Sequence, residues 1–161
     1  MKMTITTGKL LLLFMLASVA VSAQKKEKLE VDYDGKTGIA TVSGAPWCKV
    51  EKETVQLSTT YTVQNLEGNP LIVFKPVYYK DSREISQSNP DGKQSYFDII
   101  ILDAPDIKVD WRANLGKPVP QMVAMLYKHK VIVDGKVDVE AAKMFARIQG
   151  TVNTEKRRDA W

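Results

Sequence analysis

The spacing of apolar residues changes once along this chain of 161 residues, and that change constrains the fold more than any other feature. Up to about residue 111, apolar and polar residues alternate in short runs, most clearly from Val55 to Val63, which is the period of a half-buried strand. After residues 114–118 the apolar residues recur at helical spacing, first from Met122 to Tyr127 and then from Val139 to Ile148. The chain is therefore predicted to form strands first and helices afterwards.

The first part of the chain is predicted to contain six or seven strands, separated by turn sequences such as Asn65–Pro70 and Asn89–Gly92. The connections are short, which favours antiparallel neighbours. Pro76 lies inside the apolar run 71–79 and cannot donate a hydrogen bond, so this run is expected to be an edge strand or to contain a bulge. The predicted fold is α+β, a mostly antiparallel sheet of six or seven strands followed by two C-terminal amphipathic helices packed on it.

The N-terminal segment has the pattern of an export signal. Two lysines precede the apolar run Leu10–Val21, and Val21-Ser22-Ala23 has the small residues that signal peptidase recognises. The run is shorter than the roughly 20 apolar residues that a transmembrane helix needs. We therefore expect residues 1–23 to be a signal peptide, and the protein to be exported through the Sec pathway without a transmembrane span, either to the periplasm or out of the cell.

The remaining chain is expected to comprise a flexible leader at residues 24–28, a single domain at 29–150 and a polar C-terminal tail at 151–161. Residues 1–23 hold two of the 23 Lys and Arg residues and none of the 19 Asp and Glu residues, so the net charge without them is 21 minus 19, or +2. A nearly balanced charge on an exported protein does not favour a nucleic-acid partner.

Three stretches carry a resemblance to a known group of proteins: NLEGNPLIVF (65–74), YFDIIIL (96–102) and the segment from Leu126 to Gly150. Together they resemble small exported envelope proteins of Bacteroidota, a group without an assigned activity. The resemblance implies a compartment and a domain shape, and it transfers no catalytic residues.

Few residues are available for catalysis. Cys48 and His129 are the single cysteine and histidine, and they form the one possible pair of thiol nucleophile and base. Nothing in their spacing brings them together, and a buried cysteine and a surface histidine near a helix end are the commoner states. The acidic residues Asp103, Asp106 and Asp110 cluster around one turn, where aspartate is also favoured for backbone reasons.

Two loops partly match the ligand pattern of a calcium loop. Asp32 and Asp34 precede Gly35 at suitable spacing, but the twelfth position of that loop is Thr41, where calcium needs a bidentate glutamate. The second loop, around Asp134, has a lysine and an isoleucine at its first ligand positions. We therefore expect no metal and no cofactor.

The long loop Asp81–Gln94 and the strand before it are the expected contact surface, because edges and long loops concentrate binding. The candidate binding residues are Pro76, Tyr78, Tyr79, Arg83, Asn89 and Asp91. The basic run 156–158 could also contact anionic headgroups or an acidic partner.

These patterns predict a non-catalytic binding or interaction module of the bacterial cell envelope, whose partner is another envelope protein. One alternative is a small periplasmic hydrolase or thiol enzyme that uses Cys48 or the acidic turn Asp103–Asp110. A second alternative is a carrier that holds a small apolar ligand between the sheet and the helices.

Overall fold

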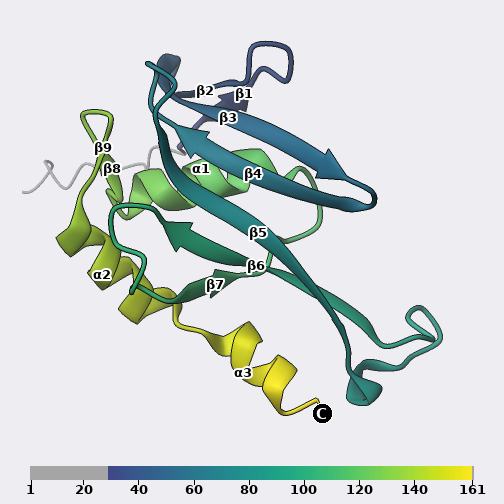
Figure 1. Ribbon diagram of the computed structural model, residues 1–161. Helices are drawn as coiled ribbons and strands as arrows, with labels where there is room; N and C mark the ends of the chain where they lie inside the picture. The colour runs from purple at the N-terminus through teal and green to yellow at the C-terminus, as the bar shows by residue number, and fades with distance from the viewer. Residues whose placement is uncertain (1–28, 161) are drawn as a thin grey trace, which may run out of the picture.

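Seven consecutive segments form one antiparallel sheet, in which every strand pairs with the next strand along the chain (Figure 1). The computed structural model describes residues 29–160. The strands are β1 (Val31–Tyr33), β2 (Ile39–Val42), β3 (Ala45–Val55), β4 (Ser58–Gln64), β5 (Pro70–Lys80), β6 (Lys93–Ile101) and β7 (Val109–Trp111). The predicted α+β class is confirmed, whereas the signal peptide and the leader predicted for residues 1–28 lie outside the described residues.

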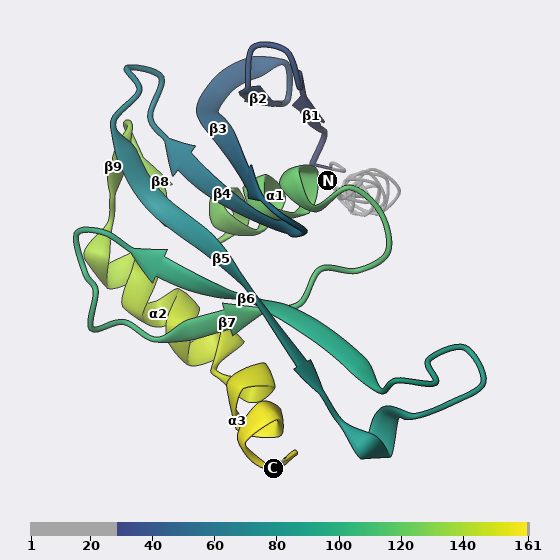
Figure 2. The same cartoon turned by 45° about the vertical axis from the view of Figure 1, so that its right-hand side comes forward.

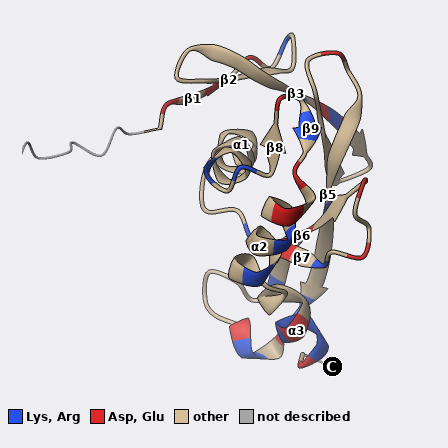
Figure 3. Ribbon diagram, turned by 90° about the vertical axis from the view of Figure 1, so that its left-hand side faces the viewer, with Lys and Arg blue, Asp and Glu red and all other residues tan. Residues whose placement is uncertain are grey.

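One face of the sheet forms the core together with helix α1 (Pro118–Lys128). Residues paired across antiparallel strands have side chains on the same face, and the pairs Val63–Ile72 and Ile72–Ile101 place three fully buried side chains in a row. Helix α1 contributes four buried residues to the same core: Val119, Met122, Val123 and Leu126. Figure 3 shows α1 lying on one side of the sheet.

A small hairpin follows α1, between the two helices that the sequence predicted. It consists of β8 (Ile132–Val133) and β9 (Lys136–Val137). The two residues between these strands, Asp134 and Gly135, have φ angles of 49° and 72°. Two successive positive φ angles are typical of the type I′ turn, whose twist suits a two-residue hairpin.

Helix α2 (Val139–Gln149) matches the second predicted helix. The carboxylate of Asp138 caps it by accepting a hydrogen bond from the backbone N–H of Ala141 at 2.9 Å, and Gly150 ends it with a φ of 69°. The helix buries Ala142 and Phe145 and contacts β7. No helix in the described part of the chain is both long and apolar enough to cross a membrane.

Most of residues 151–161, predicted as a polar C-terminal tail, is helical. Residues Val152–Arg158 form a third helix, α3, which also contacts β7. None of its residues is buried, so an apolar pattern could not reveal it. Its first turn is instead held by a carboxylate of the sheet, which is described below.

Strands β5 and β6 continue past the end of β4 as an arm, residues 75–80 and 93–98, of which only residues 97 and 98 also pair with β7 (Figure 2). Strand β5 pairs with β4 only as far as Phe74 but with β6 as far as Lys80. Pro76 thus lies where β5 has a neighbour on one side only, which suits its missing N–H group. The loop at the end of the arm contains the 3-10 helix η1 (Ser82–Glu84) and is closed by a hydrogen bond of 2.9 Å from Asp81 N to Gly92 O.

Candidate binding site

Two neighbouring tyrosines of the arm form one wall of a surface hollow. Tyr78 is 61 % exposed, and Tyr79 is half-buried, with its ring 6.1 Å from the ring of Tyr96 in an edge-to-face arrangement. Burial, assisted by the negative charge of Asp81, raises the pKa of Tyr79. Its hydroxyl therefore stays protonated and can donate a hydrogen bond to an acidic ligand.

Helix α3 forms the opposite wall, and Asp110 of β7 fixes its position. Asp110 is 1 % exposed and accepts hydrogen bonds from the backbone N–H groups of Asn153 (3.2 Å) and Thr154 (2.7 Å) and from the side chain of Asn153 (2.7 Å). These bonds satisfy N–H groups that the first turn of a helix leaves without partners. The hydroxyl of Thr154 also donates to the hydroxyl oxygen of Tyr96 at 3.3 Å.

The hollow between the two walls has a volume of about 430 Å³, and its lining combines tyrosine with arginine. Its lining residues are Tyr78, Tyr79, Thr154, Arg157 and Arg158, and we call it the tyrosine–arginine hollow. The guanidinium carbon of Arg157 lies 6.0 Å from the centre of the Tyr96 ring. Neither arginine forms an ion pair with any residue between 29 and 160. Both guanidinium groups therefore remain available for an external carboxylate or phosphate.

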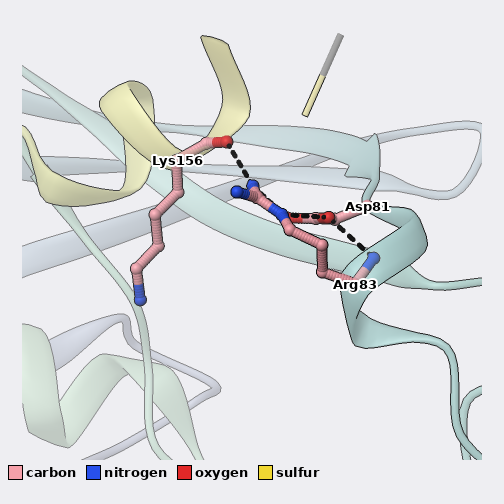
Figure 4. Close-up of polar contacts among 3 residues, drawn as sticks. All are labelled: Asp81, Arg83 and Lys156. Atoms are coloured by element: carbon pink, nitrogen blue, oxygen red, sulfur yellow. Dashed lines mark hydrogen bonds and ion pairs between the residues drawn. The ribbon is translucent and has the colours of Figure 1, made fainter. Parts of the chain in front are cut away.

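A strap of hydrogen bonds joins the arm to the far end of α3 (Figure 4). Arg83 donates from Nε and Nη2 to the carboxylate of Asp81 at 2.9 and 2.8 Å, and Nη2 also donates to the carbonyl oxygen of Lys156 at 3.4 Å. The hydrogen bonds from Arg83 hold the pKa of Asp81 below its ordinary value. The base of the loop and the last turn of α3 are thereby held next to each other.

The predicted binding residues divide into two groups in the structure. Tyr78 and Tyr79 line the hollow, and Arg83 forms the strap beside it. Asn89 and Asp91 hold the loop at the end of the arm instead: Asn89 donates to two backbone carbonyls and accepts from Lys93 N, and Asp91 pairs with Lys93 at 2.6 Å. Pro76 belongs to the arm and does not line the hollow.

Sequence reasoning missed Thr154 and did not place the basic run beside the tyrosines. Residues 154 and 79 are 75 positions apart, and their proximity depends on the bonds from Asp110 to α3. The basic residues at 156–158 were the one available signal, and without a predicted helix they could not be positioned.

The two residues proposed for thiol chemistry lie in different surroundings. Cys48 is fully buried opposite Ala40, and burial raises the pKa of its thiol to about 12. His129 ends α1, where its ring packs 5.2 Å from the ring of Phe145. The hydrogen bonds of the described residues include none between Cys48 and His129, so the arrangement does not provide an activated nucleophile.

The acidic turn does not form a pair of catalytic carboxylates. Asp103 and Asp106 are exposed in the connection between β6 and β7. Asp110 is buried, and both of its oxygens accept hydrogen bonds from α3. Its role is to hold a helix.

The candidate calcium ligands form a backbone turn. Asp34 accepts hydrogen bonds from Lys36 N at 2.9 Å and from the hydroxyl of Thr37 at 2.8 Å, and Asp32 is exposed on β1. Among residues 29–160 no three acidic, histidine or cysteine side chains gather closely enough to hold a metal ion.

Known proteins add no further evidence on the site. The chain matches no family model, no curated protein and no solved structure.

Proposed function

We propose that this protein is an exported, non-catalytic binding module of the bacterial envelope, and that its tyrosine–arginine hollow binds an acidic segment of another envelope protein. The export signal predicted at residues 1–23 supports the compartment. The observation that carries the proposed activity is the pair of arginines, Arg157 and Arg158, which line the same hollow as Tyr78 and Tyr79 and have no ion-pair partner within the described chain.

The chemistry of the hollow favours a protein partner. Tyrosine and arginine, with tryptophan, are enriched in the energetic centres of protein–protein interfaces. A guanidinium group binds a carboxylate through two parallel hydrogen bonds, and a tyrosine hydroxyl can add a third donor. A membrane surface would be contacted by a broad basic patch, whereas here two acidic residues, Glu155 and Asp159, lie on or next to the same short helix.

The proposal is tested by cross-linking the tagged protein in its own envelope and comparing the captured proteins between variants. The double variant Arg157→Ala/Arg158→Ala removes the free charges, and Arg147→Ala on the exposed face of α2 is the matched control. We expect a stoichiometric partner that is lost with the double variant, is retained with the control, and binds less tightly as salt is raised. The same variants are then tested with the purified partner and with vesicles of anionic lipid.

Three outcomes would contradict the proposal: a partner retained by the double variant, a contact region on the partner without acidic residues, or binding to anionic vesicles with no protein partner. The last outcome would assign the hollow to lipid headgroups.

A further inference from the structure

A second and larger hollow, of about 740 Å³, opens at the other end of β5. Four segments form it: the start of β3, the loop between β4 and β5, the end of α1, and the β8–β9 hairpin. Its volume falls within the range of about 300–1,000 Å³ that is usual for small-molecule sites. We call it the tryptophan hollow, after Trp47 in its lining.

Two aromatic rings provide its apolar surface. Trp47 is half-buried and Tyr127 is 40 % exposed, and their ring centres lie 5.5 Å apart in an edge-to-face arrangement. Trp47 is the extra residue of a β-bulge, because Ala40 pairs with Cys48 while the next residue, Thr41, pairs with Pro46. Bulges redirect side chains and are frequent beside binding sites.

The polar groups around the rings carry both signs of charge. Glu67 and Asp134 offer carboxylate acceptors, and Lys130 and Lys136 offer ammonium donors. All four residues are exposed, and none of them forms an ion pair with another residue between 29 and 160. Such a mixture does not select a ligand of one charge. It suits a neutral ligand with many hydroxyl groups, each of which both donates and accepts.

The walls of the hollow are fixed by Asn65. Its amide nitrogen donates to the carbonyl oxygen of Gly135 at 3.3 Å, which joins the β4–β5 loop to the β8–β9 hairpin. Its amide oxygen accepts from the backbone N–H groups of Glu67 at 3.1 Å and Asn69 at 2.9 Å. A site held in this way loses little conformational entropy on binding.

The same hydrogen bonds argue against a peptide ligand. The backbone N–H groups of Glu67, Gly68 and Asn69 are all used within the loop, and β8 and β9 pair with each other. The loop therefore offers an extended peptide no free row of N–H groups. Recognition in this hollow must rely on side chains and aromatic rings.

We propose that the tryptophan hollow binds a neutral saccharide. The C–H groups of one sugar ring pack against Trp47 and Tyr127, and its hydroxyls bond to the charged groups of the rim. This site is separate from the tyrosine–arginine hollow and does not depend on the function proposed for it.

The test uses the protein without its signal segment and a panel of neutral disaccharides built from glucose, galactose, mannose and N-acetylglucosamine. Binding is measured from the chemical shift of the Trp47 indole N–H in nuclear magnetic resonance spectra, with isothermal titration calorimetry for any disaccharide that binds. We expect at least one saturable binder whose affinity falls by about tenfold or more with Tyr127→Ala, the loss expected when an aromatic anchor is truncated.

Further variants separate the ring contacts from folding and from the other site. Trp47→Ala should abolish binding, but this substitution also removes a side chain that packs against the core. Lys136→Met at the exposed rim is a milder change, for which we expect a several-fold loss of affinity for the saccharide. Arg157→Ala/Arg158→Ala should leave saccharide binding unchanged. The proposal is overturned if no member of the panel binds, or if binding persists at wild-type affinity in both Tyr127→Ala and Lys136→Met.

Discussion

Asp98 lies on β6 directly opposite Asp110 of β7. Burial raises the pKa of its carboxyl, and the charge of Asp110 acts in the same direction, although Arg157 opposes it. The surroundings of Asp98 thus oppose its ionisation. Arg157, whose charge opposes the rise in pKa, also lines the tyrosine–arginine hollow.

The raised pKa of Asp98 predicts how stability depends on pH. The pKa of an aspartate in the unfolded chain is about 3.9, and below that pH Asp98 is protonated in both the folded and the unfolded protein. The stability that its protonated form contributes is lost as the pH rises through the higher pKa of the folded protein. Asp98→Asn should therefore raise the urea midpoint at neutral pH and leave it unchanged in acid. Asp103→Asn, at an exposed position in the β6–β7 connection, is the control and should change neither. Equal midpoints for the wild type and Asp98→Asn at neutral pH would contradict the prediction.

The reactivity of the Cys48 thiol tests the alternative that the protein is a thiol enzyme. Burial raises the pKa of its thiol from 9.0 to about 12, which lowers the thiolate fraction at neutral pH about a thousandfold. A thiol reagent should label the native protein only as fast as it unfolds, and should label it at once in urea. Ser88→Cys, in the exposed loop of the arm, provides a rapidly labelled control. Rapid labelling of native Cys48 would restore thiol chemistry as a candidate function.

Among the larger elements, the arm depends on the closure of its loop at Gly92. Gly92 has a φ of 59°, and an added Cβ would lie 2.3 Å from the carbonyl oxygen of Asp81. Because that atom belongs to the backbone, Gly92→Ala should separate the two ends of the loop.

Gly68→Ala is the matched control for Gly92→Ala, since Gly68 also has a positive φ, of 91°, but nothing lies within 4 Å of an added Cβ. We expect Gly92→Ala to cost roughly 1–3 kcal/mol more than the control, the usual range for a forced backbone shift. Urea unfolding measures the difference, and hydrogen exchange should show the extra opening in the amides of the arm. Equal costs for the two variants would show that the loop accommodates the side chain.

The elements that sequence patterns predicted are those with a local cause. The alternation from Thr59 to Val63 lies within the strand that it predicted, β4, whereas the same run begins too early, because Gln56 and Leu57 form the turn between β3 and β4. The cap of α2 at Asp138 is equally local. Helix α3 has seven residues and no buried side chain, and its stabilising partner, Asp110, precedes it by more than 40 positions. Three of the five residues that line the tyrosine–arginine hollow therefore depend on a contact that no local pattern encodes.

At the scale of the whole molecule, β5 connects the two hollows. Its eleven residues run from the loop beside the tryptophan hollow to the tyrosines of the arm, a distance of roughly 35 Å at the usual rise of a strand. The order of strands in space follows their order in the chain. The sheet can therefore form from neighbouring hairpins, while the tyrosine–arginine hollow needs the last helix.

Truncation of the chain after Gly150 tests whether the sheet forms without α3. The sheet contacts are retained, so the far-ultraviolet spectrum should remain that of a folded strand-rich protein, but the buried carboxylate of Asp110 loses three hydrogen bonds. We expect a loss of about 2–4 kcal/mol in the free energy of unfolding. Asp110→Val should recover part of the loss in the shortened chain and destabilise the chain that keeps α3. Urea titrations of the full and the shortened chain, each with and without Asp110→Val, give the coupling free energy between Asp110 and α3. Additive effects of the two changes would show that Asp110 and α3 act independently.

The hydrogen bonds that Asp110 accepts from α3 also imply an order in which the parts of the fold form. A chain that emerges from a ribosome or a translocation pore with its N-terminus first can build β1 to β7 before α3 exists. Until α3 arrives, the carboxylate of Asp110 lacks the three hydrogen bonds that it accepts from this helix, and the hydroxyl of Tyr96 lacks its bond to Thr154. Only a chain that extends through residue 158 can therefore satisfy the buried carboxylate and complete the tyrosine–arginine hollow.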